Sequence, residues 1–196
     1  MSGEALYAIV LAAGKSTRFG STKQVARYRG EALVSSAVRL AETACGSRTL
    51  LVTGNDWERV HAASAPLLGF MVRNDDYADG LASSIACGVR AVRESATAVL
   101  ILLADQPLIE DSYIERLVAA WRAHGRRLAC SRYGASLGPP SIFPRDSFDD
   151  LVALRGDRGA RQILDAHVNE LTVIDCPAGG ADVDTPADLA AIGGST

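Results

Sequence analysis

The chain has 196 residues, the size of one ordinary α/β domain, and we expect residues 1–196 to form a single domain. Hydrophobic residues make up 48% and charged residues 22% of the chain, a balance that excludes a disordered protein. The net charge is −3, without the basic excess that proteins binding duplex DNA or RNA show. We therefore expect no nucleic-acid partner.

The cysteines, the histidines and the apolar segments indicate where the protein works. The 4 cysteines and 3 histidines are scattered, with no C-x-x-C pair and no zinc-ligand spacing, so reduced and buried cysteines are expected. Ala98–Ala104 is too short to span a bilayer, and no basic segment precedes the apolar stretch Ala5–Ala13. We expect a cytoplasmic protein with no membrane partner.

The first half of the chain alternates between short apolar runs and segments with helical spacing. The run from Tyr7 to Ala13 is almost continuously apolar, which is typical of a strand buried on both faces of a parallel sheet. Two further strands are predicted over Thr49–Thr53 and Phe70–Arg73. Apolar residues at helical spacing predict helices over Leu33–Ala44, over Asp56–Leu68 and along a face formed by Leu81, Ile85, Val89 and Val92.

The second half continues this alternation. Strands are predicted over Ala98–Ala104, Leu128–Ser131 and Leu171–Asp175, and a loop over Gly134–Pro144. Ser112-x-x-Glu115 has the pattern of a capping box before a helix that carries Trp121. The remaining predicted helices cover Asp146–Leu154, Gly159–His167 and a segment capped by Asp184 or Thr185, with Pro186 in its first turn. The alternation predicts an α/β fold, a doubly wound, mostly parallel sheet with helices on both faces.

The loop after the first strand is rich in small and basic residues. It reads Leu11-Ala-Ala-Gly-Lys-Ser-Thr-Arg-Phe-Gly, and Lys23 follows. It is not a P-loop, because Ile9 stands where that motif needs glycine, and Ala12 likewise breaks the dinucleotide-binding fingerprint. Small residues let backbone N–H groups approach phosphate, and the basic side chains would neutralise its charge. A simple glycine turn with solvated lysines fits the spacing equally well.

Asp105 follows the most apolar strand directly and cannot belong to a hydrophobic core. A carboxylate there must be paired, cap a helix or hold a cation, and Mg²⁺ commonly takes one or two protein carboxylates. Asp182 and Asp184 alternate across Val183, so one of them can join Asp105. The alternative for Asp184 is that it only caps the last helix.

Taken together, these motifs resemble the signature of the MobA-like nucleotidyltransferases. The glycine loop with Lys23 is similar to that family's first motif. Four further segments are similar to its molybdenum cofactor cytidylyltransferase (MocA-like) branch, and they are Asn74 with Gly80-Leu-Ala-Ser-Ser, Ala104-Asp-Gln-Pro, Leu154-Arg-Gly-Asp-Arg-Gly-Ala-Arg and Asp182-Val-Asp-Thr-Pro-Ala-Asp. The resemblance extends from about Ala8 to Leu189 and implies a Rossmann-like nucleotidyltransferase fold.

The resemblance implies Mg²⁺-dependent transfer of CMP from CTP to the phosphate of molybdopterin, with release of pyrophosphate and a molybdoenzyme as a possible client. It implies catalytic roles for Lys23, Arg18 and Asp105 and a metal site at Asp105 and Asp184. The nucleotide-binding residues that it implies are Leu11, Ala12, Ala13, Gly14, Lys15, Ser16, Lys23, Asn74, Gly80 and Ser83.

Several alternatives remain open at this point. The Ala12-Ala13-Gly14 form of the loop goes with CTP in the family, whereas an Ala-Gly-Gly form goes with GTP. A guanylyltransferase acting on molybdopterin, a cytidylyltransferase for a sugar or polyol phosphate, and a carrier of molybdenum cofactor without catalysis are the other functions considered. The chain departs from the branch at Gly138-Pro139-Pro140, where relatives often carry Gly-His-Pro.

Overall fold

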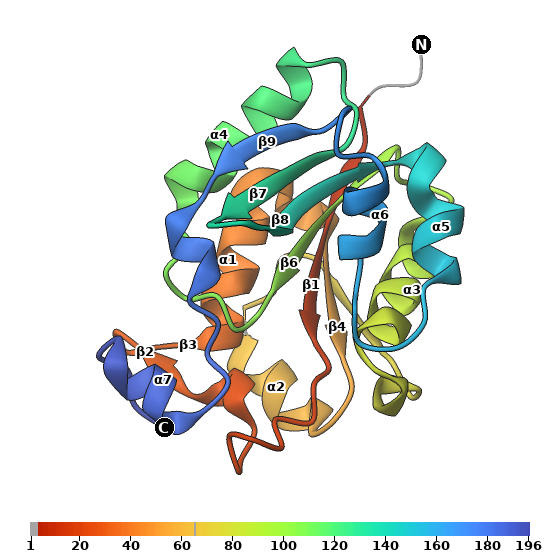
Figure 1. Ribbon diagram of the computed structural model, residues 1–196. Helices are drawn as coiled ribbons and strands as arrows, with labels where there is room; N and C mark the ends of the chain where they lie inside the picture. The colour runs from red at the N-terminus through yellow and green to blue at the C-terminus, as the bar shows by residue number, and fades with distance from the viewer. Residues whose placement is uncertain (1–3, 65) are drawn as a thin grey trace.

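The computed structural model describes residues 4–64 and 66–196. Residues 1–3 of the expected domain, and residue 65 of the predicted helix Asp56–Leu68, lie outside the described residues. The main sheet in the described part has seven strands in the order β5-β4-β1-β6-β8-β7-β9 (Figure 1). Its neighbours pair in parallel except where β8 lies between β6 and β7, so the doubly wound, mostly parallel sheet is confirmed.

The elements have the following bounds. The strands of the main sheet are β1 (Leu6–Ala12), β4 (Thr49–Thr53), β5 (Phe70–Arg73), β6 (Ala98–Leu103), β7 (Ala129–Tyr133), β8 (Ser136–Pro144) and β9 (Thr172–Asp175). A small hairpin consists of β2 (Arg27–Tyr28) and β3 (Glu31–Ala32). The helices are α1 (Leu33–Cys45), α2 (Trp57–Ser64), α3 (Leu81–Val92), α4 (Asp111–Ala123), α5 (Phe148–Ala153), α6 (Arg161–Ala166) and α7 (Pro186–Ala191).

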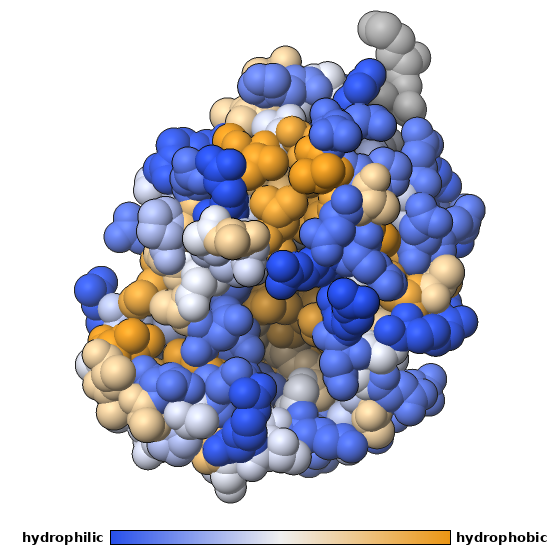
Figure 2. All heavy atoms as spheres, in the orientation of Figure 1, coloured by the Kyte–Doolittle hydropathy of each residue, from blue (hydrophilic) through white to orange (hydrophobic). Residues whose placement is uncertain are grey.

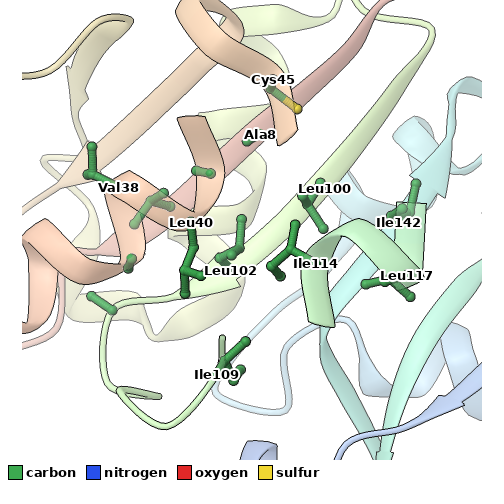
Figure 3. Packing of buried hydrophobic residues seen from close by; sticks show 14 of the residues in the cluster. Ala8, Val38, Leu40, Cys45, Leu100, Leu102, Ile109, Ile114, Leu117 and Ile142 are labelled. Atoms are coloured by element: carbon green, nitrogen blue, oxygen red, sulfur yellow. The ribbon is translucent and has the colours of Figure 1, made fainter. Parts of the chain in front are cut away.

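Successive residues of the central strands enter two different cores. In β1, Ala8 and Val10 pack under α1 and α4, whereas Ile9 and Leu11 pack under α3, α5 and α6. Figure 3 shows Leu40 of α1 and Ile114 of α4 beside the β6 side chains on the first of these faces. Helices therefore cover both faces of the sheet, which explains why its central strands are apolar without interruption.

Three sequence predictions need correction. The predicted loop Gly134–Pro144 is mostly strand β8, and the helix predicted over Asp56–Leu68 is found over Trp57–Ser64, with Pro66, Leu67 and Leu68 outside it. The Ser112-x-x-Glu115 capping box does not form, because α4 begins at Asp111 and both residues already lie inside the helix. At the last helix, in contrast, Thr185 forms a capping box with Asp188 and Pro186 follows it, as predicted.

The carboxyl ends of β1 and β6 lie side by side at one edge of the sheet, because the two strands pair in parallel. A small third core of Phe19, Leu33, Val183 and Leu189 joins the C-terminal segment to this edge. In the described part of the chain, none of the helices has both the length and the hydrophobicity needed to cross a membrane.

Glu4 ties the start of β1 to α4 and makes stability depend on pH. Its carboxylate accepts hydrogen bonds from Arg122 (2.6 Å) and pairs with Arg126 (3.1 Å). Arg122 lowers the pKa of Glu4 below its ordinary 4.5, despite some burial that raises it. Since the folded-state pKa is depressed, the stabilisation is present above pH 4.5 and is lost as pH falls through the folded-state value.

We therefore expect Glu4→Gln to lower the melting temperature at pH 7 and to approach the wild-type melting temperature as pH falls below 4. Thermal melts of both proteins across this range measure the difference. A difference in melting temperature that stays constant with pH would contradict the ion-pair explanation. Asp150→Asn, an exposed change on α5, serves as the control.

Candidate active site

The loop after β1 is held by a buried glutamine. Gln24 donates from Nε2 to the carbonyl oxygen of Gly14 (3.0 Å) and accepts at Oε1 from the hydroxyl of Ser16 (3.1 Å). The hydroxyl of Ser16 in turn accepts from the backbone N–H of Lys23 (3.2 Å), and Ser16 itself has a positive φ of 54°. These contacts fix the loop in one conformation and bring Lys23 to the carboxyl end of β6.

Lys23 joins the carboxylates that the sequence singled out. Its Nζ lies 2.6 Å from Asp105 Oδ2 and 3.1 Å from Asp184 Oδ1, and it donates to the carbonyl oxygen of Val183 (2.9 Å). Arg18, which is mostly exposed, pairs with the other oxygen of Asp184 (2.9 Å). The residues predicted for catalysis and for metal binding, with Asp105 in both sets, thus form one cluster of four side chains.

The electrostatics of the cluster keep Lys23 charged. Burial by itself lowers the pKa of Lys23, but the carboxylates of Asp105 and Asp184 outweigh it and raise the pKa above 10.5. Burial also raises the pKa of Asp182 above 3.8, and the negative charge of Asp105 adds to this effect. At neutral pH, Lys23 is therefore a fixed positive charge at the edge of the sheet.

Asp105 and Asp184 fit a divalent cation bound together with phosphate. Asp105 Oδ1 is buried and has no hydrogen-bond partner among the described residues. In the same part of the chain, no group of three or more histidine, cysteine, aspartate or glutamate side chains is arranged around a metal position. A cation at this point would take one or two protein carboxylates and complete its shell with phosphate and water, as Mg²⁺ usually does.

A cavity of about 500 Å³ opens beside this cluster. Figure 2 shows the hollow below the centre of this face, with hydrophilic side chains around its rim. Its lining includes residues of the β1 loop, the cluster and the start of α3, and these are Leu11, Ala13, Gly14, Lys15, Ser16, Arg18, Lys23, Gln24, Tyr77, Gly80, Leu81, Ser84, Asp105 and Asp157. The volume is typical of a small-molecule site.

Three residues predicted to bind nucleotide, Ala12, Asn74 and Ser83, do not line this cavity. The side chain of Asn74 is buried and donates to the hydroxyls of Ser83 (2.9 Å) and Ser84 (3.0 Å). Ser83 then donates to the carbonyl oxygen of Gly80 (2.8 Å). These bonds support the start of α3, and Gly80 and Ser84 are the members of this group that reach the cavity.

Several polar lining residues were not predicted as site residues, among them Gln24, Tyr77, Ser84 and Asp157. Gln24 and Tyr77 stand in no spacing that marks chemistry, and Ser84 lies in the Gly80-Leu-Ala-Ser-Ser motif without a role of its own. Asp157 lies within the Leu154–Arg161 motif, whose Gly156–Arg161 part the resemblance implies to be a loop on the acceptor side. Lys15 lies over the ring of Tyr77, with Nζ 5.9 Å from the ring centre, which is a contact that only the folded chain reveals.

The sequence of this chain matches a known protein family over most of its length. The sequence model of the MobA-like NTP transferase domain matches residues 8–171. The chain belongs to the MobA-like NTP transferase family. It is accordingly a nucleotidyltransferase, and this family uses nucleoside triphosphates as small-molecule substrates.

Individual proteins are similar to this chain over nearly its whole length. The purine catabolism protein PucB of Bacillus subtilis is 29% identical over 194 residues, which cover 93% of each chain. The crystal structure of Rv0371c from Mycobacterium tuberculosis superposes with a TM-score of 0.81 at 26% identity and covers 98% of each chain. A second structure of Rv0371c, in complex with manganese, gives a TM-score of 0.79 at 26% identity, with 96% of this chain and 97% of that chain covered. That structural relative therefore binds a divalent cation.

Gly80 is required by the backbone at the cavity wall. Its φ of 97° and ψ of −177° lie in a region that is almost restricted to glycine. A Cβ at this position would also lie 2.8 Å from the backbone of Gly156 and against the carboxylate of Asp157. Gly125 has a similar φ of 80°, but a Cβ there would meet no atom within 4 Å.

We expect Gly80→Ala to reduce the free energy of unfolding by about 2 kcal/mol and to weaken nucleoside triphosphate binding, because strain and the displaced Gly156–Asp157 loop act together. Gly125→Ala should lose about 1 kcal/mol through strain alone and keep its affinity. Urea denaturation and nucleotide titration measure both quantities. Equal nucleotide affinity in the two variants would show that the loop contact is irrelevant to binding.

Proposed function

We propose that this protein transfers CMP from CTP to the phosphate of molybdopterin in molybdenum cofactor and releases pyrophosphate, with Mg²⁺ as cofactor. The observation that carries the proposal is the cluster of Lys23, Asp105 and Asp184 beside a cavity that begins at the β1 loop. Nucleotidyl transfer needs this combination, since it depends on positioned phosphates and on stabilised charge more than on a strong base.

The β1 loop is suited to hold the triphosphate. The small residues Ala13 and Gly14 let phosphate approach the backbone, and Lys15, Ser16 and Arg18 line the same cavity. In this arrangement the acceptor phosphate attacks the α-phosphorus in line, and the bond from the α-phosphorus to the pyrophosphate oxygen breaks. Lys23 would then stabilise the charge that grows on the α-phosphate and on the leaving pyrophosphate.

Asp105 and Asp184 are the residues proposed to hold Mg²⁺. When bound, the cation neutralises phosphate charge and orients the nucleotide. Lys23 pairs with one oxygen of each carboxylate, and Oδ1 of Asp105 has no hydrogen-bond partner among the described residues. Arg18, at 2.9 Å from Asp184, orients this carboxylate from the solvent side. Among the other predicted nucleotide-binding residues, we propose that Gly80 contacts the nucleotide directly, and that Asn74 and Ser83 act by supporting the start of α3.

The choice of CTP rests on the Ala12-Ala13-Gly14 form of the loop and on the resemblance to the MocA-like branch. The similarity to a protein of purine catabolism supports a molybdoenzyme of purine breakdown as the client that receives the product. GTP as the nucleotide, or a sugar or polyol phosphate as the acceptor, would leave the roles of Lys23, Asp105 and Asp184 unchanged.

The test is pyrophosphate release by the purified protein with each of the four common NTPs and Mg²⁺, with and without molybdenum cofactor. Release with CTP only when cofactor is present is the expected result. Release with GTP, or with CTP and a sugar phosphate, would replace the proposed specificity. Tight cofactor binding with no release from any NTP would identify a carrier instead of an enzyme.

A further inference from the structure

The segment that carries Asp184 is held to the end of β6 by a side chain that has no role so far. Gln106 follows Asp105 and is only 4% exposed. Its Nε2 donates to the carbonyl oxygen of Gly179 (2.9 Å) and to Asp182 Oδ1 (3.0 Å). Because both partners accept and neither can donate, the amide group can be oriented in only one way.

Both backbone groups of Val183 add to this attachment. The N–H of Val183 donates to the carbonyl oxygen of Asp105 (2.9 Å), and the carbonyl oxygen of Val183 accepts from Lys23 Nζ (2.9 Å). The side chain of Val183 is buried in the small core with Leu33 and Leu189. Asp182 and Asp184 thus take different partners, Gln106 for the first and Lys23 for the second.

If Gln106 served packing alone, its buried amide would destabilise the fold relative to an apolar side chain. Its Oε1 is buried with no hydrogen-bond partner among the described residues, and an apolar side chain of the same length would avoid that unpaired oxygen. What the amide provides is a pair of donors to the Gly179–Asp182 segment. These donors hold the backbone at Gly179, five residues before Asp184, and the carboxylate of Asp182, two residues before it.

We propose that Gln106 is a positioning residue, which holds the Asp182–Asp184 segment so that Asp184 meets Asp105 at the metal position. The inference rests on the proposed function in one respect, namely that Asp105 and Asp184 bind the cation. Residues that orient metal ligands from behind commonly change metal affinity by about 10- to 100-fold when they are replaced. Gln106 acts on the cation through Asp182 and the backbone and needs no direct contact with it.

The test compares Gln106→Met with Tyr113→Phe in the full chain. Methionine keeps an unbranched side chain of similar length but cannot donate. Tyr113 is a matched control, because its buried hydroxyl donates to the hydroxyl of Ser131 (2.7 Å), lies 3.3 Å from the carbonyl oxygen of Ile174, and does not line the cavity. Three quantities are measured: the melting temperature, hydrogen exchange of the peptide covering residues 179–184, and the Mn²⁺ dissociation constant with CTP present, from electron paramagnetic resonance of free Mn²⁺.

We expect Gln106→Met to speed exchange in this peptide and to raise the Mn²⁺ dissociation constant about tenfold or more. Tyr113→Phe should lower the melting temperature and leave both other quantities unchanged. Unchanged exchange in Gln106→Met, or faster exchange with unchanged Mn²⁺ affinity, would overturn the positioning role alone. A wild-type protein that binds no Mn²⁺ would refute the proposed metal site and this inference with it.

Discussion

Lys23→Met is expected to reduce kcat for nucleotidyl transfer by about 10²- to 10³-fold, with a smaller change in the KM for the nucleotide. The range is the usual effect of removing one group that stabilises developing negative charge. The pKa of Lys23 is raised by the neighbouring carboxylates, so the wild-type protein presents a full positive charge at neutral pH. Methionine fills similar space but leaves Asp105 and Asp184 facing each other without a cation.

Pyrophosphate release under steady-state conditions measures this effect. Arg116→Met, on the exposed face of α4, is the control for losing one positive charge far from the cavity. Lys23→Arg keeps the charge in a different shape and should recover part of the activity. A kcat for Lys23→Met within threefold of the wild type, roughly 0.6 kcal/mol, would remove Lys23 from the catalytic step.

Asp105→Asn is expected to lower transfer activity at a fixed Mg²⁺ concentration by about 100-fold or more. An asparagine keeps the shape of the side chain but removes the negative charge that would hold the cation, and a bound metal supplies several kcal/mol of charge stabilisation. A loss of about 2.7 kcal/mol of that stabilisation corresponds to a factor of 100. The substitution also breaks the 2.6 Å ion pair with Lys23.

The measurement is activity as a function of Mg²⁺ concentration. The Asp105→Asn curve should shift to higher Mg²⁺ as well as fall, because the affinity for the cation is reduced. Asp149→Asn, which removes an exposed carboxylate on α5, is the matched control. Full activity of Asp105→Asn at the normal Mg²⁺ concentration would refute the assignment of Asp105 as a metal ligand.

The main features of the fold were predictable because they follow from the pattern of apolar residues along the chain. The Ala98–Leu103 strand and the Asp105 that follows it could be read directly, since a parallel strand covered on both faces has no polar positions. The convergence of Lys23 and Asp105 also follows from the parallel pairing of β1 and β6, which brings their carboxyl ends together. The apolar pattern of the strands and the parallel geometry of the sheet therefore both predict a site at the carboxyl ends of β1 and β6.

Strand β8 was missed because its glycine and prolines suggest a loop. Pro139 and Pro140 lack an N–H group, yet they belong to β8, a strand that lies between β6 and β7. They fit because the pairing register with β7 shifts between Cys130 and Ser131, and the hydroxyl of Ser131 donates to the carbonyl oxygen of Pro140 (2.7 Å). Because Cys130 pairs with Ser141 and Ser131 with Gly138, Pro139 and Pro140 are the extra, unpaired residues of this bulge in β8. The position of such a bulge depends on pairing with the neighbouring strand, which the local sequence does not show.

The supporting side chains of the site were predictable only in part. Asn74 carries a motif, but the hydroxyls of Ser83 and Ser84 use both of its amide hydrogens, so it supports the wall instead of lining the cavity. Gln24 and Gln106 act through buried amide groups whose partners lie 10 and 73 residues away in sequence. Such roles depend on tertiary contacts and leave no periodic signal.

The contacts of Lys23 have a consequence for the order of events during folding. They join residues separated by 82 positions at Asp105 and by 161 positions at Asp184. Closing such long loops carries an entropic penalty before any contact compensates for it, and long-range contacts therefore tend to form late. The sheet from β1 to β6 can assemble while the Asp184 segment is still undocked. In refolding, the circular dichroism signal of the sheet should return before enzymatic activity, and the delay would be the time that the last carboxylate needs to reach its lysine.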